Sequence, residues 1–352
     1  MHELPLSLRR NRTLTDEELK ALIESASFDA DLASLADSVR RAYYGTDVYL
    51  RGLVEFSNYC KNDCFYCGIR HGNKALDRYR LSEDEILTCC ETGYALGYRT
   101  FVLQGGDDPS YDDAKMVVLV AKIRKRYEDC AITLSFGEKT KDGYRAFFEA
   151  GANRYLLRHE TANEVHYRRL HPPTMDLKKC QACLWSLKEI GYQVGSGFLV
   201  GSPYQTTECL IADLRFLEQL RPDMIGIGPF IAHRNTPFHH FSNGSLPLTL
   251  RLISVLRLMF PNALIPATTA LGTIAPQGRE LGLRCGANIV MPNLSPIAVR
   301  KKYELYDNKI CTDEEAAENH QRLEQQVAQA GYNVVSHIGN VRPLRPLGTT
   351  PK

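Results

Sequence analysis

The chain has 352 residues, 44% of them hydrophobic, and 43 Lys and Arg against 41 Asp and Glu. This composition supports a large buried core and excludes a disordered chain, and the length suits either two modest domains or one α/β barrel. The nearly balanced charge, without an extended basic run, predicts no nucleic-acid partner and no anionic membrane partner.

Residues 1–47 are expected to form an N-terminal helical extension. Two amphipathic stretches begin near Thr15 and Asp29, and we expect them to pack on the outside or base of the fold that follows. The first twenty residues are rich in charge, so a signal peptide is not predicted, and no run of about eighteen apolar residues could span a bilayer. An odd number of cysteines, 11, mostly isolated in apolar segments, predicts buried thiols in a reducing compartment. The expected location is therefore the cytoplasm.

Eight apolar runs recur between residues 48 and 312, and amphipathic stretches of helical length separate most of them. The runs are 48–57, 99–105, 131–137, 154–160, 193–201, 224–230, 264–270 and 288–293. Eight strands alternating with helices predict a (β/α)8 TIM-type barrel over residues 48–312, because each helix returns the chain for the next parallel strand. A doubly wound open sheet remains an alternative, since spacing alone does not establish closure. Residues 313–352 are expected to form a C-terminal helix and tail that pack on the barrel.

Two helix starts can be predicted directly. Ser82 followed by Glu85 has the pattern of a capping box, which predicts a helix from there to about Leu96. Thr206 shows the same signal less cleanly, ahead of an apolar stretch from Cys209 to Leu220.

A cysteine cluster follows the first run directly. Cys60, Cys64 and Cys67 lie within eight residues, in a loop at the C-terminal end of a predicted strand, where barrel enzymes keep their chemistry. Thiolates suit iron-sulfur clusters and zinc. Three ligands for a four-iron cluster leave one iron with an open position, which a reactive site needs. A zinc site completed by His71 is the structural alternative.

The Cys-x3-Cys-x2-Cys spacing, with Tyr66 before the last cysteine, resembles the signature of the radical S-adenosylmethionine (SAM) superfamily. The resemblance implies one 4Fe-4S cluster held by Cys60, Cys64 and Cys67, whose open iron chelates SAM. The reduced cluster then donates an electron to the sulfonium, and a 5'-deoxyadenosyl radical forms. In the same family, glycine-rich strands such as 195–201 and 226–230 pass along the bound SAM.

Further positions carry roles that the resemblance implies, each with a structural alternative such as a turn, a rim salt bridge or strand packing. Asp107, after two glycines, stands where the family usually has Glu, and Lys179 stands near a position where the family tends to have Arg for the SAM carboxylate. The implied cofactor-binding residues are Tyr66, Gln104, Gly105, Gly106, Asp107, Ser135, Glu160 and Lys179. The implied substrate-binding residues are Arg51, Arg158, Thr268, Thr269 and Tyr303.

Segments 50–58, 158–163, 226–231, 266–270 and 285–293 are similar to the HydE family of iron-iron hydrogenase maturases. This similarity implies a small cysteine-related or organo-iron substrate, a reductant such as ferredoxin or flavodoxin, and other maturases as partners. Cys311 matches the first ligand of a second cluster in some members, but no further cysteine follows it, so a second cluster is not expected. Cys180 and Cys183 are interpreted as half-buried thiols on a helix, although a redox or metal role is the alternative.

Two other functions remain open at this point. A methylornithine synthase-like mutase would use the same cofactor on an amino acid, and a non-catalytic iron-sulfur or zinc scaffold would not cleave SAM at all.

Overall fold

The barrel strands are short and parallel. In this computed structural model, which describes residues 2–310 and 316–346, one sheet has the order β2–β3–β4–β5–β6–β8. Its members are β2 (Gly52–Ser57), β3 (Thr100–Gly105), β4 (Ala131–Ser135), β5 (Arg154–Leu156), β6 (Gln193–Ser196) and β8 (Met224–Ile225). Each strand leaves through a helix and returns parallel to its neighbour, as the alternating pattern predicts.

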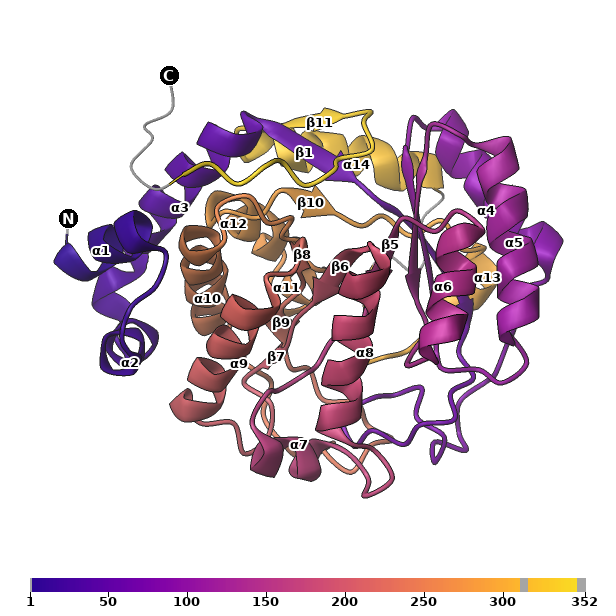
Figure 1. Ribbon diagram of the computed structural model, residues 1–352, viewed down its shortest axis with the longest axis horizontal. Helices are drawn as coiled ribbons and strands as arrows, with labels where there is room; N and C mark the ends of the chain where they lie inside the picture. Colours follow the sequence, from indigo (N-terminus) through magenta and orange to yellow (C-terminus); the bar gives the residue numbers. More distant parts are fainter. Residues whose placement is uncertain (1, 311–315, 347–352) are drawn as a thin grey trace.

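Backbone bridges complete the ring. Met224 of β8 pairs in parallel with Leu264, and Pro266 pairs with Ile289 of β10 (Ile289–Val290). β10 pairs with β1 (Asp47–Leu50), and Leu53 of β2 pairs with Asn293. All eight predicted runs therefore contribute to a closed (β/α)8 barrel (Figure 1), and the open-sheet alternative is wrong.

The predicted strand 48–57 is divided at Arg51. Its first part, β1, pairs with β10 on one side and with β11 (Asn333–Val335) on the other, whereas β2 pairs with β3. Runs 193–201 and 224–230 are also divided, because their ends form the separate pair β7 (Leu199–Val200) and β9 (Gly228–Pro229). The pairing of β11 with β1 was not predicted, since three residues near the end of a chain carry no periodic signal.

The helices agree with most of the predicted starts. Thr15 and Ser82 each form a complete capping box, whereas Thr206 is the N-cap residue of α9 without a side-chain cap bond. The helices are α1 (Glu3–Asn11), α2 (Asp16–Glu24), α3 (Asp29–Tyr44), α4 (Glu83–Ala95), α5 (Asp113–Arg126), α6 (Lys141–Glu149), α7 (Glu164–Leu170), α8 (Leu177–Ile190), α9 (Thr207–Leu220), α10 (Leu246–Met259), α11 (Thr269–Ile274), α12 (Gly278–Arg284), α13 (Ile297–Arg300) and α14 (Ala316–Gln329), with the 3-10 turn η1 (Ala26–Phe28).

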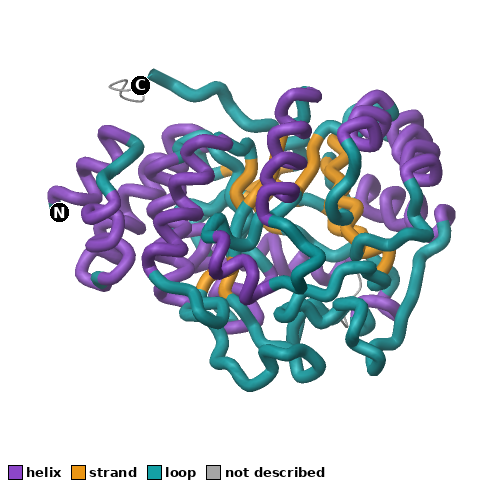
Figure 2. The backbone as a smooth tube through the Cα atoms, turned by 60° about the horizontal axis from the view of Figure 1, so that its bottom comes forward, coloured by secondary structure: helices purple, strands orange, loops and turns teal. Residues whose placement is uncertain are grey.

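The two ends of the barrel differ. α14, β11 and the tail lie over one end (Figure 1), where Arg154 donates hydrogen bonds to the carbonyl oxygen of Ile338 (2.8 Å) and to Oδ1 of Asn340 (2.7 Å). The long loops gather at the opposite end, which Figure 2 brings forward. This loop face contains the cysteine segment and therefore the candidate site.

The N-terminal helices lie beside the barrel. α3 packs on α10 and α12, and α1 packs on α3 and α10. The division of the chain at residues 47/48 and 312/313 stays a prediction. Among the described residues, no helix is long and apolar enough to cross a membrane.

Candidate active site

The three clustered cysteines lie in the loop after β2, and each is partly buried. Arg78 ties this loop together, because its guanidinium donates to four loop carbonyls, those of Asn58, Ile69 (2.8 Å), Arg70 (2.6 Å) and Asn73 (3.2 Å). A planar guanidinium with five fixed donors can bind several carbonyls at once, which a lysine cannot do. The segment around the cysteines is thereby held in one conformation.

Burial and mutual proximity set the protonation of the thiols. Burial is the main cause that raises the pKa of Cys60, of Cys64 and of Cys67, the last to about 12. The thiols also raise one another's pKa, which places them close together. Thiols in this state bind a metal by exchanging their protons for a cationic centre. The donor set therefore fits an iron-sulfur cluster with three protein ligands.

The zinc alternative depends on His71 as a fourth ligand beside the three cysteines. His71 is exposed, its N–H donates to the carbonyl of Asn62 at 2.9 Å, and its carbonyl oxygen accepts from Nζ of Lys74 at 3.3 Å. Within the described residues, no hydrogen bond joins its ring to the cysteine loop.

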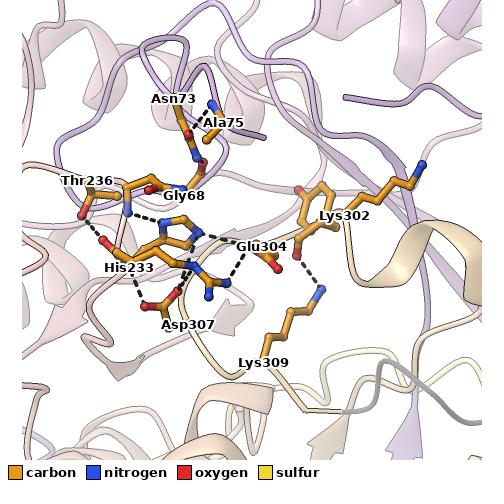
Figure 3. Close-up of polar contacts among 12 residues, drawn as sticks. Gly68, Asn73, Ala75, His233, Thr236, Lys302, Glu304, Asp307 and Lys309 are labelled. Atoms are coloured by element: carbon orange, nitrogen blue, oxygen red, sulfur yellow. Dashed lines mark hydrogen bonds and ion pairs between the residues drawn. The ribbon is translucent and has the colours of Figure 1, made fainter. Parts of the chain in front are cut away.

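A polar network joins Gly68, in the cysteine loop, to His233 and Glu304 (Figure 3). Gly68, directly after Cys67, donates its N–H to the carbonyl of Leu305 at 2.8 Å. A Cβ on Gly68 would lie 2.0 Å from the carbonyl oxygen of Glu304 and 2.5 Å from the ring of His233, so only glycine fits. His233 is fully buried, and its Nε2 lies 3.4 Å from Oε2 of Glu304. This network fixes segment 303–309 against the loop.

The Gly-Gly-Asp turn after β3 contacts the cysteine loop through backbone. The N–H of Gly106 donates to the carbonyl of Ser57 at 3.0 Å, and a Cβ on Gly106 would lie 2.1 Å from the carbonyl oxygen of Tyr59 and 2.7 Å from Cβ of Cys60. Gly105 packs less tightly against backbone, since its missing Cβ would meet only the ring of Phe56, at 2.7 Å. Close approach of main chain to the first cysteine is therefore the measurable role of Gly106.

The two aspartates after these glycines differ in surroundings. Asp107 forms ion pairs with Lys61 (3.0 Å) and Lys139 (3.0 Å). Asp108 is fully buried and accepts two hydrogen bonds from Arg80, at 2.7 and 3.0 Å, and one from the Ser57 hydroxyl at 2.6 Å. Asp108 therefore stabilises the fold locally, whereas Asp107, also buried, is paired with two lysines.

Arg158 and Glu160 follow the end of β5 (Arg154–Leu156). They form an ion pair of 2.9 Å, and Glu160 has φ +62°, a conformation uncommon for a residue with a side chain. Burial raises the pKa of Glu160 while Arg158 opposes the shift, and Glu160 adds in a minor way to the raised pKa of Cys64 and Cys67. The carboxylate is therefore near the thiols.

A buried hydrogen-bond network holds His159, the residue between Arg158 and Glu160. His159 is fully buried, with Nδ1 2.9 Å from the hydroxyl of Ser196 and Nε2 3.3 Å from Oδ1 of Asp213. Asp213 also accepts the N–H of Ala162. These contacts fix the backbone that carries Arg158 and Glu160.

Tyr66 makes a defined contact at the edge of the loop. Its hydroxyl lies 3.1 Å from Nε2 of His171, whose Nδ1 lies 3.0 Å from the carbonyl oxygen of Tyr167. Burial lowers the pKa of His171 to about 4, so the ring is neutral and donates to the carbonyl through Nδ1. Nε2 then accepts, and the Tyr66 hydroxyl donates to it.

Several other predicted residues face the barrel interior. Gln104 and Ser135 are partners across β3 and β4, and Gln104 lies within hydrogen-bonding range of the buried Tyr303. Thr268 and Thr269 stand at the start of α11, and Oγ1 of Thr268 is buried without a hydrogen-bond partner in the described part of the chain. Arg158 has one such donor atom, Nε, because its terminal nitrogen is engaged in the ion pair with Glu160. These unpartnered groups provide polar contacts for a bound molecule.

Lys179 and Arg51 lie apart from this group. Lys179 is 70% exposed and pairs with Glu138 at 3.5 Å. Arg51 is fully buried at the covered end of the barrel, beside Arg154 and a small cavity with room for about one water molecule. Burial lowers the pKa of Arg51, and two of its nitrogens have no hydrogen-bond partner among the described residues.

The remaining cysteines make few polar contacts. Cys180 and Cys183 are buried on α8, with Sγ atoms 3.9 Å from the carbonyl of Arg158 and 3.7 Å from that of Lys139. All ten described cysteines are free. Cys311 lies outside the described residues.

Sequence reasoning missed several residues of the site, notably Arg78, Lys139, His159, His171 and His233. Lys139 and His159 follow ends of strands, a position that could have singled them out. His171 and His233 carry no spacing signal, because they reach the loop only through the fold.

Comparisons with known proteins agree with this geometry. Residues 54–217 match the family model described as the radical SAM superfamily. The [FeFe] hydrogenase maturase subunit HydE of Thermotoga maritima is 46% identical over 305 residues, covering 86% of this chain and 87% of that protein. 3-Methylornithine synthase of Methanosarcina barkeri is 34% identical over 84% of both chains.

A solved structure has a similar fold. The crystal structure of methylornithine synthase (PylB) superposes with a TM-score of 0.82 and 31% identity, covering 94% of this chain and 97% of the other.

Proposed function

The chain belongs to the radical SAM superfamily, and from that premise we propose that it cleaves SAM reductively as a HydE-type maturase of iron-iron hydrogenase. The observation that carries this proposal is the 46% identity to the HydE subunit over nearly the full length of both chains. The cysteine loop at the open end of the barrel supports it, since its three partly buried thiols suit a cluster with one open iron.

Each part of the site has a task in this proposal. Cys60, Cys64 and Cys67 would hold a 4Fe-4S cluster, which with bound SAM supplies a 5'-deoxyadenosyl radical. Gly106 brings the Gly-Gly-Asp backbone against the first ligand. Glu160, near the thiols and fixed by its ion pair with Arg158, is the acceptor we assign to SAM. Tyr66, Gln104, Gly105, Asp107, Ser135 and Lys179 complete the proposed cofactor set.

The substrate proposed is a small cysteine-related or organo-iron molecule. The unpartnered donors of Arg158 and Thr268 support an anionic or zwitterionic ligand, because buried polar groups without partners are costly unless a ligand satisfies them. Thr269, Tyr303 and Arg51 are proposed to add polar contacts along the interior. A cytoplasmic reductant, ferredoxin or flavodoxin, and other hydrogenase maturases are the proposed partners.

A methylornithine synthase-like activity is the second candidate, and the TM-score of 0.82 to PylB favours it specifically. The products separate the two. Reconstituted, dithionite-reduced enzyme given SAM and lysine would release methylornithine only under the second candidate.

The test of the first candidate has two readouts. Anaerobic reconstitution followed by chromatography should show 5'-deoxyadenosine formed from SAM. Addition of the protein to a hydrogenase maturation mixture that lacks HydE should restore hydrogen evolution. A cluster that leaves SAM intact would instead establish a non-catalytic scaffold, and SAM cleavage without restored hydrogen evolution would refute the maturase role.

A further inference from the structure

A group of exposed basic residues borders the cysteine loop, and we call it the lysine strip: Lys61, His71, Lys74, Lys178 and Lys179. Lys61 directly follows Cys60, and its side chain is 54% exposed. His71, Lys74 and Lys178 are also exposed, and Lys179 is 70% exposed. The strip thus joins the first cluster ligand to the start of α8.

Contacts show that the strip is continuous. Nζ of Lys74 lies 3.3 Å from the carbonyl oxygen of His71, and the N–H of His71 donates to Asn62 at 2.9 Å. Lys61 and Lys179 both act on Glu138. Burial raises the pKa of Glu138, and both lysines oppose this shift, with Lys179 only 3.5 Å away.

The charge that reaches solvent here is positive. The carboxylates beneath the strip are buried: Asp107 is 3% exposed and Glu138 18% exposed. Asp63 is neutralised by Arg70 at 2.6 Å. The exposed Asp176 is engaged as the N-cap of α8, where it accepts the N–H of Lys178 at 2.8 Å. Lys61 and Lys179 pair with Asp107 and Glu138, whereas Lys74 and Lys178 form no ion pair within the described residues. The strip therefore keeps a net positive charge, on a chain whose formal charge is only +2.

The position and charge of the patch indicate the kind of partner that would bind there. The cysteine loop lies at the loop end of the barrel, whereas β11 and the tail cover the other end, so a carrier approaches the loop most closely from the loop end (Figures 1 and 2). A basic patch attracts acidic proteins and raises their association rate by about 10- to 1,000-fold at low ionic strength.

We propose that the lysine strip is the docking site of an acidic one-electron carrier protein. This inference rests on the proposed function, because it assigns the surface through which that reaction receives its electron. One electron leaves the reduced carrier and enters the oxidised cluster. The carrier is oxidised by one electron and the cluster is reduced by one electron, and no bond or proton is exchanged.

The test uses the double variant Lys74→Glu/Lys178→Glu of the reconstituted holoenzyme, since neither residue is assigned to the cluster, SAM or substrate. SAM cleavage is measured with dithionite and, separately, with photoreduced flavodoxin as the donor. The matched control is Lys125→Glu/Arg126→Glu, two exposed residues at the C-terminal end of α5, which runs back toward the covered end of the barrel.

The expected result is a rise of about tenfold or more in the apparent KM for flavodoxin at low salt. Dithionite-driven cleavage and the Kd for SAM should not change, and the control should match wild type in every assay. Because the Debye length is about 8 Å at 0.15 M salt, the difference should shrink as salt is added.

An unchanged KM for flavodoxin, or an equal rise in the control, would overturn the inference. If wild type fails to cleave SAM even with dithionite, the proposed function fails instead. In that case the Kd for oxidised flavodoxin is measured by titration for wild type and for both double variants. Weaker binding by the strip variant alone would support the docking site, and equal binding by all three would refute it.

Discussion

Gly106→Ala tests whether close backbone contact between the Gly-Gly-Asp turn and the cysteine loop organises the cluster. The added Cβ would lie 2.1 Å from the carbonyl oxygen of Tyr59 and 2.7 Å from Cβ of Cys60. An ordinary C···O contact is about 3.3 Å or longer, so the two segments must part by about 1 Å. Overpacking of this kind costs about 1–3 kcal/mol in the free energy of unfolding.

The effect on activity should exceed the effect on stability. A displacement of about 1 Å in a catalytic arrangement can lower a rate by about 100-fold. We therefore expect Gly106→Ala to fold, to bind less iron and sulfide per chain, and to form 5'-deoxyadenosine about 100-fold more slowly with dithionite. Thermal denaturation of the apoprotein, iron and sulfide content, and the cleavage rate are the measurements.

Gly93→Ala is the matched control. Its added Cβ would lie 2.5 Å from Cδ1 of Leu294, the end of a flexible side chain. Leu294 binds the backbone of Leu53 near the start of β2, whereas the cysteine loop follows the end of β2. This variant should show a modest change in stability with normal iron content and rate. Wild-type iron content and cleavage in Gly106→Ala would refute the reasoning.

Three further predictions concern ligands and supports of the loop. Cys64→Ala should abolish both the cluster absorbance and SAM cleavage, and retained cleavage would remove this residue from the ligand set. Arg78→Lys should lower the iron content after reconstitution, because lysine cannot replace the several hydrogen bonds to loop carbonyls, each worth about 1 kcal/mol. Unchanged iron content would show that these bonds of Arg78 do not organise the cysteine loop. For Asp108, burial alone would raise the pKa, but the hydrogen bonds from Arg80, from Ser57 and from a backbone N–H outweigh it and hold the pKa below 3.8. The stabilisation is therefore present above about pH 4 and lost as the pH falls through the lowered pKa. Asp108→Asn should lose about 1–3 kcal/mol at pH 7, a range that allows for the 37% exposure of Arg80, and its urea midpoint should vary less than that of wild type between pH 5 and pH 3. Equal pH dependence of the two proteins would contradict this assignment.

The sequence alone predicted eight strands that alternate with helices, and it singled out three cysteines as candidate cluster ligands. Eight apolar runs at the spacing of strand and helix, and three cysteines within eight residues, are local patterns that each segment carries by itself. The capping boxes at Thr15 and Ser82 belong to the same class, since four consecutive residues contain the whole signal.

Closure of the ring and the surroundings of the site depended on the tertiary structure. The bridges from Met224 to Leu264 and from Pro266 to Ile289 join segments whose pairing no spacing specifies. Lys179, placed by resemblance near SAM, is 70% exposed and pairs with Glu138, a contact that its position in the sequence did not predict.

The physical reason is the range over which each feature is encoded. Periodicity and ligand spacing follow from contacts between near neighbours in the chain. The buried set of His159, Ser196 and Asp213, by contrast, comes from three segments whose register only the closed barrel fixes. These side chains meet only when strands and helices are packed together. Their contacts therefore depend on the whole sequence and not on any one segment.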